Sequence, residues 1–423
     1  MYTFVLDTNR QPIDPCHPSV ARKLLKDGKA AVFKRFPFTI ILKEQKPECE
    51  RSFRLKIDPG SRTTGFALAR GDEIIWGAEL AHRGLQIKNN LESRRGVRKG
   101  RRSRNTRYRP ARFLNRTKHK GWLPPSLESR VYNIMSWVKK IQASVPVSNI
   151  SMELVKFDMQ KMANPEISGF EYQQGELAGY EVREYLLEKW GRKCAYCGKK
   201  DIPLQVEHII PRARGGSDRV SNLTLACQKC NQKKGTKTAE EFGFKDIQKK
   251  AKAPLKDAAA VNATRWRLYQ RLTEETGCHV ETGSGSLTKY NRHKCNIEKA
   301  HWLDAACVGR STPHTLTSRV SSVLEIKAKG KGNRQFCQTN KYGFPIKHRG
   351  KEKLSHGLMT GDIVAVNVTA NLKTKGRYTS RVAGIMRGKP SFCLSKGKNW
   401  WVNQQYLRKI QCADGYEYNY KAA

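Results

Sequence analysis

Between Cys194 and Gly235 the chain reads CAYCGKKDIPLQVEHIIPRARGGSDRVSNLTLACQKCNQKKG. Two Cys-x-x-Cys pairs stand in this stretch, and twenty-nine residues separate the first pair from the second. Each pair supplies two thiolates at the geometry that a tetrahedral metal needs. The spacing therefore predicts one structural zinc site, with four ligands: Cys194, Cys197, Cys227 and Cys230.

The same stretch holds polar residues that a bare zinc site does not need: Glu207, His208, Asn222 and Asn231. Taken one at a time, they are typical of ordinary surface positions. Together, VEHIIPRARGG and SNLTLACQKCNQKKG resemble the HNH (ββα-metal) nuclease family. The resemblance implies that His208 is the general base, that Glu207 and Asn231 hold one Mg²⁺, and that Asn222 orients the histidine. An imidazole pKa near 6.5 suits proton abstraction from water near neutral pH. The family often has Asp where this chain has Glu207.

The composition points to a polyanionic partner. Lys and Arg number 81 against 37 Asp and Glu, a net charge of +44 over 423 residues. Such an excess repels itself unless a polyanion neutralises it, which favours nucleic acid over an anionic membrane surface. No apolar run approaches the roughly 18 residues of a membrane span, and the N-terminus does not have the pattern of a signal peptide. Outside the two pairs, the eight other cysteines are scattered, which indicates reduced cytosolic thiols.

The stretch FRLKIDPGSRTTGFALARGDEIIWGAEL (53–80) alternates with period two and breaks at Pro59-Gly60 and Gly71-Asp72. This pattern predicts an antiparallel meander whose first strand ends in Asp58. Further along, we expect helices near 18–28, 126–143, 257–276 and 299–309, with Ser126 as an N-cap. Strands are expected at 149–155 and in the C-terminal region, where they would form a small barrel or open sheet.

Four other polar residues stand where catalysis could use them: at the end of a strand, within a strand, and at i, i+3 on a helix. They are Asp58, Glu153, His301 and Asp304. Each alone is typical of a solvated residue. Together, KIDPGSRTTG, ISMELV and KAHWLDAA resemble the RuvC nuclease site on an RNase H fold. The resemblance implies that Asp58, Glu153 and Asp304 hold Mg²⁺, while His301 serves as ligand or base.

Residues 88–120 contain fourteen Lys or Arg and one acid, Glu92. Because this stretch is internal, it resembles the arginine-rich bridge helix of RNA-guided nucleases more than a basic tail. Gly96, Gly100 and Pro110 predict that it is not one uninterrupted helix. Arginines at these positions can contact phosphates and stack on bases. The candidates are Arg94, Arg95, Arg98, Arg101, Arg102, Arg104, Arg107, Arg109 and Arg112.

The order of these segments resembles the IscB family of transposon-encoded RNA-guided nucleases, related to the CRISPR type II effector nucleases. The implied fold is α/β multidomain: an RNase H-like mixed sheet split in three, an inserted HNH module and a small β-rich domain. PCHPSVARKLLKDGKAAV looks like the N-terminal segment named for Pro-Leu-Met-Pro, although that tetrapeptide is absent. The expected boundaries are 1–50 N-terminal segment, 51–86 RuvC I, 87–122 bridge, 123–184 RuvC II, 185–246 HNH, 247–318 RuvC III and 319–423 basic C-terminal domain.

The resemblance implies an RNA-guided DNA endonuclease, monomeric within a ribonucleoprotein in the prokaryotic cytosol. Its HNH site would cut the guide-paired strand and its RuvC-like site the displaced strand. The C-terminal region, with Trp400, Trp401 and Tyr406, is the expected contact for RNA and for a motif flanking the target. Two alternatives stay open. A protein-guided homing endonuclease or resolvase would cut without RNA, and a non-catalytic zinc-containing RNA-binding protein would never cut.

Overall fold

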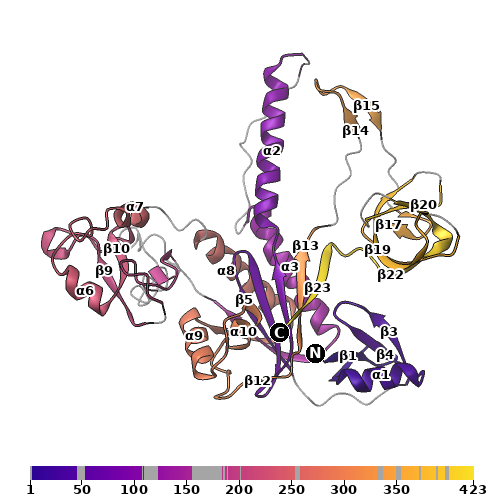
Figure 1. Ribbon diagram of the computed structural model, residues 1–423, viewed down its shortest axis with the longest axis horizontal. Helices are drawn as coiled ribbons and strands as arrows, with labels where there is room; N and C mark the ends of the chain where they lie inside the picture. Colours follow the sequence, from indigo (N-terminus) through magenta and orange to yellow (C-terminus); the bar gives the residue numbers. More distant parts are fainter. Residues whose placement is uncertain are drawn as a thin grey trace.

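The structure is a computed structural model, and it describes residues 2–44, 53–106, 108, 122–154, 183, 186–187, 189–200, 202–252, 258–330, 337–348, 354–370, 373–386, 389–395 and 400–423. The chain is a mixed α/β protein with several parts around one central sheet (Figure 1). No helix among the described residues combines the length and the apolar character that crossing a membrane requires.

The N-terminal unit is a four-stranded sheet in the order β2-β1-β4-β3 with one helix. Its elements are β1 (Thr3–Leu6), β2 (Pro12–Cys16), α1 (Pro18–Lys26), β3 (Ala30–Lys34) and β4 (Thr39–Leu42). The expected helix is confirmed: Pro18 stands in its first turn, and Gly28 follows its end at φ +69°. Only a residue without Cβ adopts that angle at no cost, so Gly28 ends the helix.

The central sheet has the strand order β11-β8-β5-β6-β7-β13-β23, with β12 (Thr317–Ser318) beside β7. The strands are β5 (Phe53–Pro59), β6 (Thr63–Arg70), β7 (Glu73–Ala81), β8 (Val147–Glu153), β11 (His279–Gly283), β13 (Ser322–Ala328) and β23 (Tyr416–Ala422). The antiparallel meander β5-β6-β7 is confirmed, and β8 joins β5 in parallel. Segments far apart in sequence therefore build one sheet.

Helices cover both faces of this sheet. On one face, α3 (Pro125–Gln142) and α8 (Ala258–Glu275) pack Val131, Trp137 and Leu268 against Phe66 and other β-strand residues. On the other face lies α10 (His301–Ala306), whose Trp302 and Ala305 pack with Ala67. The helix α9 (Gly285–Lys294) stands next to α10. Burial on both faces explains why Lys56 of β5 is only 2% exposed, although it carries a charge.

The helix α2 (Gly84–Ser103) projects away from the sheet (Figure 1). It runs through Gly96 and Gly100, so these glycines do not interrupt it, but it ends at Ser103. The expectation that the arginine-rich stretch is not one uninterrupted helix is therefore confirmed, although the helix does not end at either glycine. Each glycine costs about 1 kcal/mol in a helix, and strong helix formers such as Leu, Gln, Glu, Lys and Arg at other positions outweigh that cost. Ser126, the expected N-cap of α3, lies inside that helix, because Pro125 already occupies its first turn.

A separate small module lies on one side of the sheet (Figure 1). It contains β9 (Leu204–His208), β10 (Leu223–Cys227), α6 (Gln228–Lys234) and α7 (Asp246–Lys252), with short 3-10 turns at Arg212–Arg214 and Val220–Asn222. The strands β9 and β10 form an antiparallel pair. This module has its own hydrophobic core, built around Leu204, Leu225 and Ile247.

The C-terminal region contains a five-stranded antiparallel sheet in the order β21-β20-β19-β18-β22. Its strands are β18 (Ile363–Val368), β19 (Gly376–Ile385), β20 (Ser391–Leu394), β21 (Trp400–Asn403) and β22 (Leu407–Gln411). Two hairpins precede it: β14 (Cys337–Thr339) with β15 (Pro345–His348), and β16 (Leu354–Ser355) with β17 (Leu358–Met359). A 3-10 turn, Gln404–Tyr406, joins β21 to β22.

The expected C-terminal domain, residues 319–423, does not form a separate unit at either of its ends. The strand β13 pairs in parallel with β7, and β23 pairs with β13, so both belong to the central sheet. The reason is burial: Val323, Leu324 and Ile326 are at most 3% exposed. The C-terminal β-rich part is thus an excursion between two strands of the central sheet.

Candidate functional site

Four cysteines converge beside the start of α6: Cys194, Cys197, Cys227 and Cys230. Their Sγ atoms all lie within 4.8 Å of one another. A Zn–S bond of about 2.3 Å places tetrahedral sulfurs about 3.8 Å apart, and Cys197 Sγ lies 3.8 Å from Cys227 Sγ. Burial raises the pKa of Cys194, but backbone hydrogen bonds at Cys197 and Cys227 outweigh it and lower that pKa to about 7. The arrangement fits a structural zinc ion.

Glu207 is held inside the small module. Its carboxylate is 6% exposed, Lys234 Nζ lies 2.5 Å from Oε1, and Tyr196 Oη donates to Oε2 at 2.6 Å. The Lys234 side chain has no exposed surface, and its Nζ also donates to the carbonyl of His208 at 2.8 Å. Both oxygens are engaged by protein donors, so Glu207 belongs to a buried ion pair in this structure, and its expected role as a magnesium ligand stays a prediction. A buried carboxylate needs such a partner.

The two asparagines act on the backbone and on β9. Asn222 is buried; its Oδ1 accepts from Ile210 N at 2.9 Å, and its Nδ2 donates to the carbonyls of Ile210 and Ser217. It therefore clamps the loop that follows His208, and none of these three hydrogen bonds goes to the imidazole. Asn231 of α6 donates from Nδ2 to Gln205 Oε1 at 2.8 Å, which ties α6 to β9.

His208 ends β9, and its Nε2 lies 2.6 Å from Asp218 Oδ1. Arg212 contacts the same carboxylate, at 2.7 Å from Nη2. The hydrogen bonds to His208 and to Arg212 hold the pKa of Asp218 below its ordinary value. A carboxylate that orients a histidine base is a recurrent catalytic arrangement. Sequence reasoning missed Asp218, because nothing in its spacing from His208 marks it.

Asp58, Glu153, His301 and Asp304 meet at one edge of the central sheet. The parallel register pairs Ile57 with Met152, and Asp58 and Glu153 are the next residues of β5 and β8. Both carboxylates therefore lie at the carboxyl ends of two neighbouring strands. Asp58 pairs with Gly65 of β6, where an added Cβ would lie 1.8 Å from the His301 carbonyl oxygen. Gly65 thus admits the start of α10, and the fold gathers all four residues from three elements.

Two arginines, which the sequence did not single out, neutralise this edge. Arg265 of α8 donates from Nη2 to Glu153 Oε1 at 2.9 Å, and Arg292 Nε of α9 lies 3.0 Å from Asp304 Oδ1. Burial raises the pKa of Asp304; the charge of Glu153 adds to the rise and Arg292 opposes it. The hard oxygen donors are those that Mg²⁺ prefers. Among the described residues, however, only the four cysteines bring three or more metal-ligating atoms within 4.8 Å of one another.

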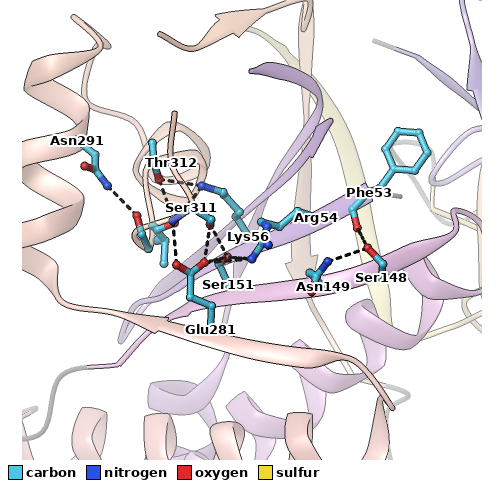
Figure 2. A network of polar contacts seen from close by, with 12 residues as sticks. Phe53, Arg54, Lys56, Ser148, Asn149, Ser151, Glu281, Asn291, Ser311 and Thr312 are labelled. Carbon is cyan, nitrogen blue, oxygen red and sulfur yellow. Dashed lines mark hydrogen bonds and ion pairs between the residues drawn. The ribbon is translucent and has the colours of Figure 1, made fainter. Parts of the chain in front are cut away.

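A polar network fixes the turn after α10 to the sheet (Figure 2). Lys56 Nζ donates to the Val308 carbonyl at 3.0 Å and to Thr312 Oγ1 at 2.8 Å. Glu281 of β11 accepts from Ser311 N at 2.9 Å, and from three further donors: Arg54, the Ser151 hydroxyl and the Ser311 hydroxyl. Burial lowers the pKa of Lys56 to about 8, partly opposed by Glu281. These contacts hold α10, and with it Asp304, against β5, β8 and β11.

Three of the five arginines of α2 (Gly84–Ser103) are exposed to solvent. They are Arg94, Arg95 and Arg98. At the far end of the helix, Arg104 donates to the Lys341 carbonyl and Arg101 lies 3.5 Å from Thr339 Oγ1, so α2 meets the β14–β15 hairpin (Figure 1). Arg102 lies near this end, half-buried. Three further predicted contacts, Arg107, Arg109 and Arg112, lie outside the described residues.

Residues 194–247 match the family described as HNH endonuclease, and residues 3–175 match the family described as RRXRR protein. No curated protein matches the chain. The similar solved structures include Streptococcus thermophilus Cas9 in complex with the AGAA PAM (14% identity, TM-score 0.23) and with the GGAA PAM (16%, 0.24). Each alignment covers 61% of this chain and 32% of that one. The Type II-C Cas9 enzyme from Actinomyces naeslundii aligns at 17% identity and TM-score 0.16, over 46% of this chain and 26% of that one.

The chain spans about a third of the length of the first two of these structures. The match over 194–247 coincides with the module that contains the cysteines and His208. The chain therefore contains an HNH endonuclease domain over residues 194–247. It combines this domain with an RRXRR region.

Proposed function

We propose that this protein is an RNA-guided DNA endonuclease of the IscB type with two cutting sites. The observation that carries the proposal is the placement of the HNH module. It lies in the chain between β8 and β11, neighbouring parallel strands of a sheet that gathers Asp58, Glu153, His301 and Asp304 at one edge. The arginine-rich α2 leaves the same sheet after β7. This order of parts is the one that the IscB resemblance implies.

In the HNH module, His208 accepts the proton of the attacking water. Asp218 holds the ring through Nε2, and it stabilises the imidazolium that forms once the proton has arrived. The loop clamped by Asn222 keeps the end of β9 in place. Because Glu207 pairs with Lys234, we assign it to the stability of the module and derive no step through a metal at this site.

At the sheet edge, Asp58, Glu153 and Asp304 would hold Mg²⁺, which would stabilise the charge that develops on the leaving oxygen. The chain's own contribution is to set these carboxylates on rigid strands and on a helix. The Lys56 and Glu281 network prevents α10 from sliding along the sheet. Arg265 and Arg292 compensate the negative charge of Glu153 and Asp304.

Two surfaces suit nucleic acid. The exposed arginines of α2 match the phosphates of an RNA guide. The C-terminal sheet carries a groove of about 630 Å³ with two arginines and two tyrosines: Arg377, Arg408, Tyr378 and Tyr406. Aromatic rings beside guanidinium groups stack on bases and contact phosphates. Trp401, 45% exposed, stands on the same sheet with Trp400. We assign this sheet to the motif that flanks the target.

The test is to sequence the RNA that co-purifies with the protein, then to cut a duplex matching its variable end, with each strand labelled separately. Asp58→Ala and His208→Ala should each leave a nickase, with opposite strand preference. The double variant should bind the duplex and leave it intact. Cutting without any RNA would support a protein-guided enzyme instead. Loss of both cuts in either single variant, with binding preserved, would contradict two independent sites.

A further inference from the structure

We propose that a groove on the far side of the fold from the sheet-edge carboxylates binds the phosphate backbone of the guide RNA. This deepens the proposed function and rests on the chain having an RNA partner. The groove lies between the N-terminal unit, α3 and α8, and has a volume of about 420 Å³. It is lined by Lys34, Tyr132, Met135, Ser136, Lys139, Lys140, Ala143 and Arg271.

The lining contains four cations and no acid. Three of the four have counter-ions that lie outside the lining: Glu275 contacts Lys139 at 2.6 Å and Arg271 at 2.5 Å, and Asp414 contacts Lys140 at 2.8 Å. These acids therefore hold the cations in place without closing the groove. Side chains preset in this way lose little entropy when an anion arrives.

Lys34 is the fourth cation of the lining, and it differs from the other three in its contacts. Within the described ranges its ammonium has no hydrogen bond or ion pair, and it lies 5.3 Å from the centroid of the Phe33 ring. Burial lowers the pKa of Lys34, and the nearby charge of Lys140 lowers it further. Two ammonium groups held close enough to repel each other are stabilised by an anion placed between them. A phosphate is such an anion.

The rim adds an aromatic surface. Tyr132 is 57% exposed, and the Arg271 guanidinium lies 4.7 Å from its ring centroid. An exposed ring braced by a guanidinium can stack with an unpaired base, while the lysines contact the adjoining phosphates. This combination fits a single-stranded or looped nucleic acid better than a protein partner, which would need apolar area or acidic side chains.

The distance between the groove and Glu153 indicates whether the groove binds RNA or the DNA that is cut. Lys139 and Lys140 lie at the end of α3, just before β8 begins at Val147, whereas Glu153 ends that strand. Seven strand residues at roughly 3.3 Å each separate the two ends by about 20 Å. The scissile phosphate must reach Glu153, so the groove holds a different segment. The partner that stays bound throughout is the guide.

The test compares Lys34→Gln/Lys139→Gln with a matched control, Lys26→Gln/Lys29→Gln. The control removes two exposed lysines of the same N-terminal unit that lie outside the groove. Full-length proteins are titrated with the co-purified guide RNA at several salt concentrations. Loss of two phosphate contacts should reduce the slope of log affinity against log salt by about 1.4. The control should change the slope less than this. In wild type, RNA carrying 4-thiouridine should form a photo-crosslink to Tyr132.

An unchanged slope in the groove variant, or one that matches the control, would overturn the proposal while leaving the proposed function in place. A slope that changes for target DNA binding by the preloaded complex, but not for RNA binding, would also overturn it and assign the groove to DNA. If wild-type protein binds no RNA, this proposal and the proposed function both fail. Equal thermal stability of all variants shows that folding is not the cause.

Discussion

Replacing Lys234 by methionine should open the HNH module locally, because it leaves the buried Glu207 carboxylate without its cation. Lys234 Nζ and Glu207 Oε1 are 2.5 Å apart, with side-chain exposures of 0% and 6%. At an effective dielectric of about 20, that distance corresponds to about 7 kcal/mol of attraction. The free-energy cost of removing both charges from water cancels much of this attraction. Breaking such a pair from one side costs about 3–5 kcal/mol.

Hydrogen exchange on the full chain measures this loss of stability at individual strands of the HNH module. A loss of about 3–5 kcal/mol should speed amide exchange in β9 and β10 by roughly two to three and a half orders of magnitude. Lys233→Met is the matched control, since it changes the neighbouring, exposed lysine of the same helix. The double variant Glu207→Gln/Lys234→Met removes both charges and should recover most of the protection.

Two outcomes would refute this reasoning. Exchange in Lys234→Met within a few-fold of the Lys233→Met control would show that the pair does not stabilise the module. A double variant as open as the sum of the two single variants would show that the residues act independently.

Zinc removal is testable by elemental analysis: Cys230→Ser should lose the metal and protection in β9–β10, whereas Cys412→Ser, an exposed cysteine outside the cluster, should keep one zinc per chain. Alanine at the three exposed arginines of α2 should lower the salt slope of RNA binding by about 2, and an unchanged slope would exclude phosphate contacts there. The exposed set is Arg94, Arg95 and Arg98. With a folded pKa of about 8 against 10.5 unfolded, Lys56 makes the unfolded chain bind more protons between these values. Wild type should therefore gain up to about 3 kcal/mol over Lys56→Met as pH rises through that window, seen in the Tm difference; a constant difference would argue against desolvation of Lys56.

Local patterns were the part of the molecule that sequence could predict. The period-two alternation over 53–80 gave the meander, and the doubled Cys-x-x-Cys spacing gave the metal cluster. What escaped prediction depends on contacts between distant residues or on how a side chain folds back. Lys234 turning onto Glu207 and Asp218 reaching His208 are of this kind. So is the pairing of β13 with β7, since no periodicity says which edge a strand will join.

The pairing of β13 with β23 has a consequence for how the chain is made. The strand β13 ends at Ala328, and its antiparallel partner β23 begins at Tyr416, 88 positions later in the chain. At roughly 5–20 residues per second of synthesis, about 4–18 s pass before the partner emerges from the ribosome. Throughout that interval one edge of an apolar strand has unpaired backbone groups, which is a template for association with other chains. Nascent chains should therefore engage chaperones most strongly after residue 328 has emerged, and slower translation of the C-terminal sheet should lower the yield of soluble protein.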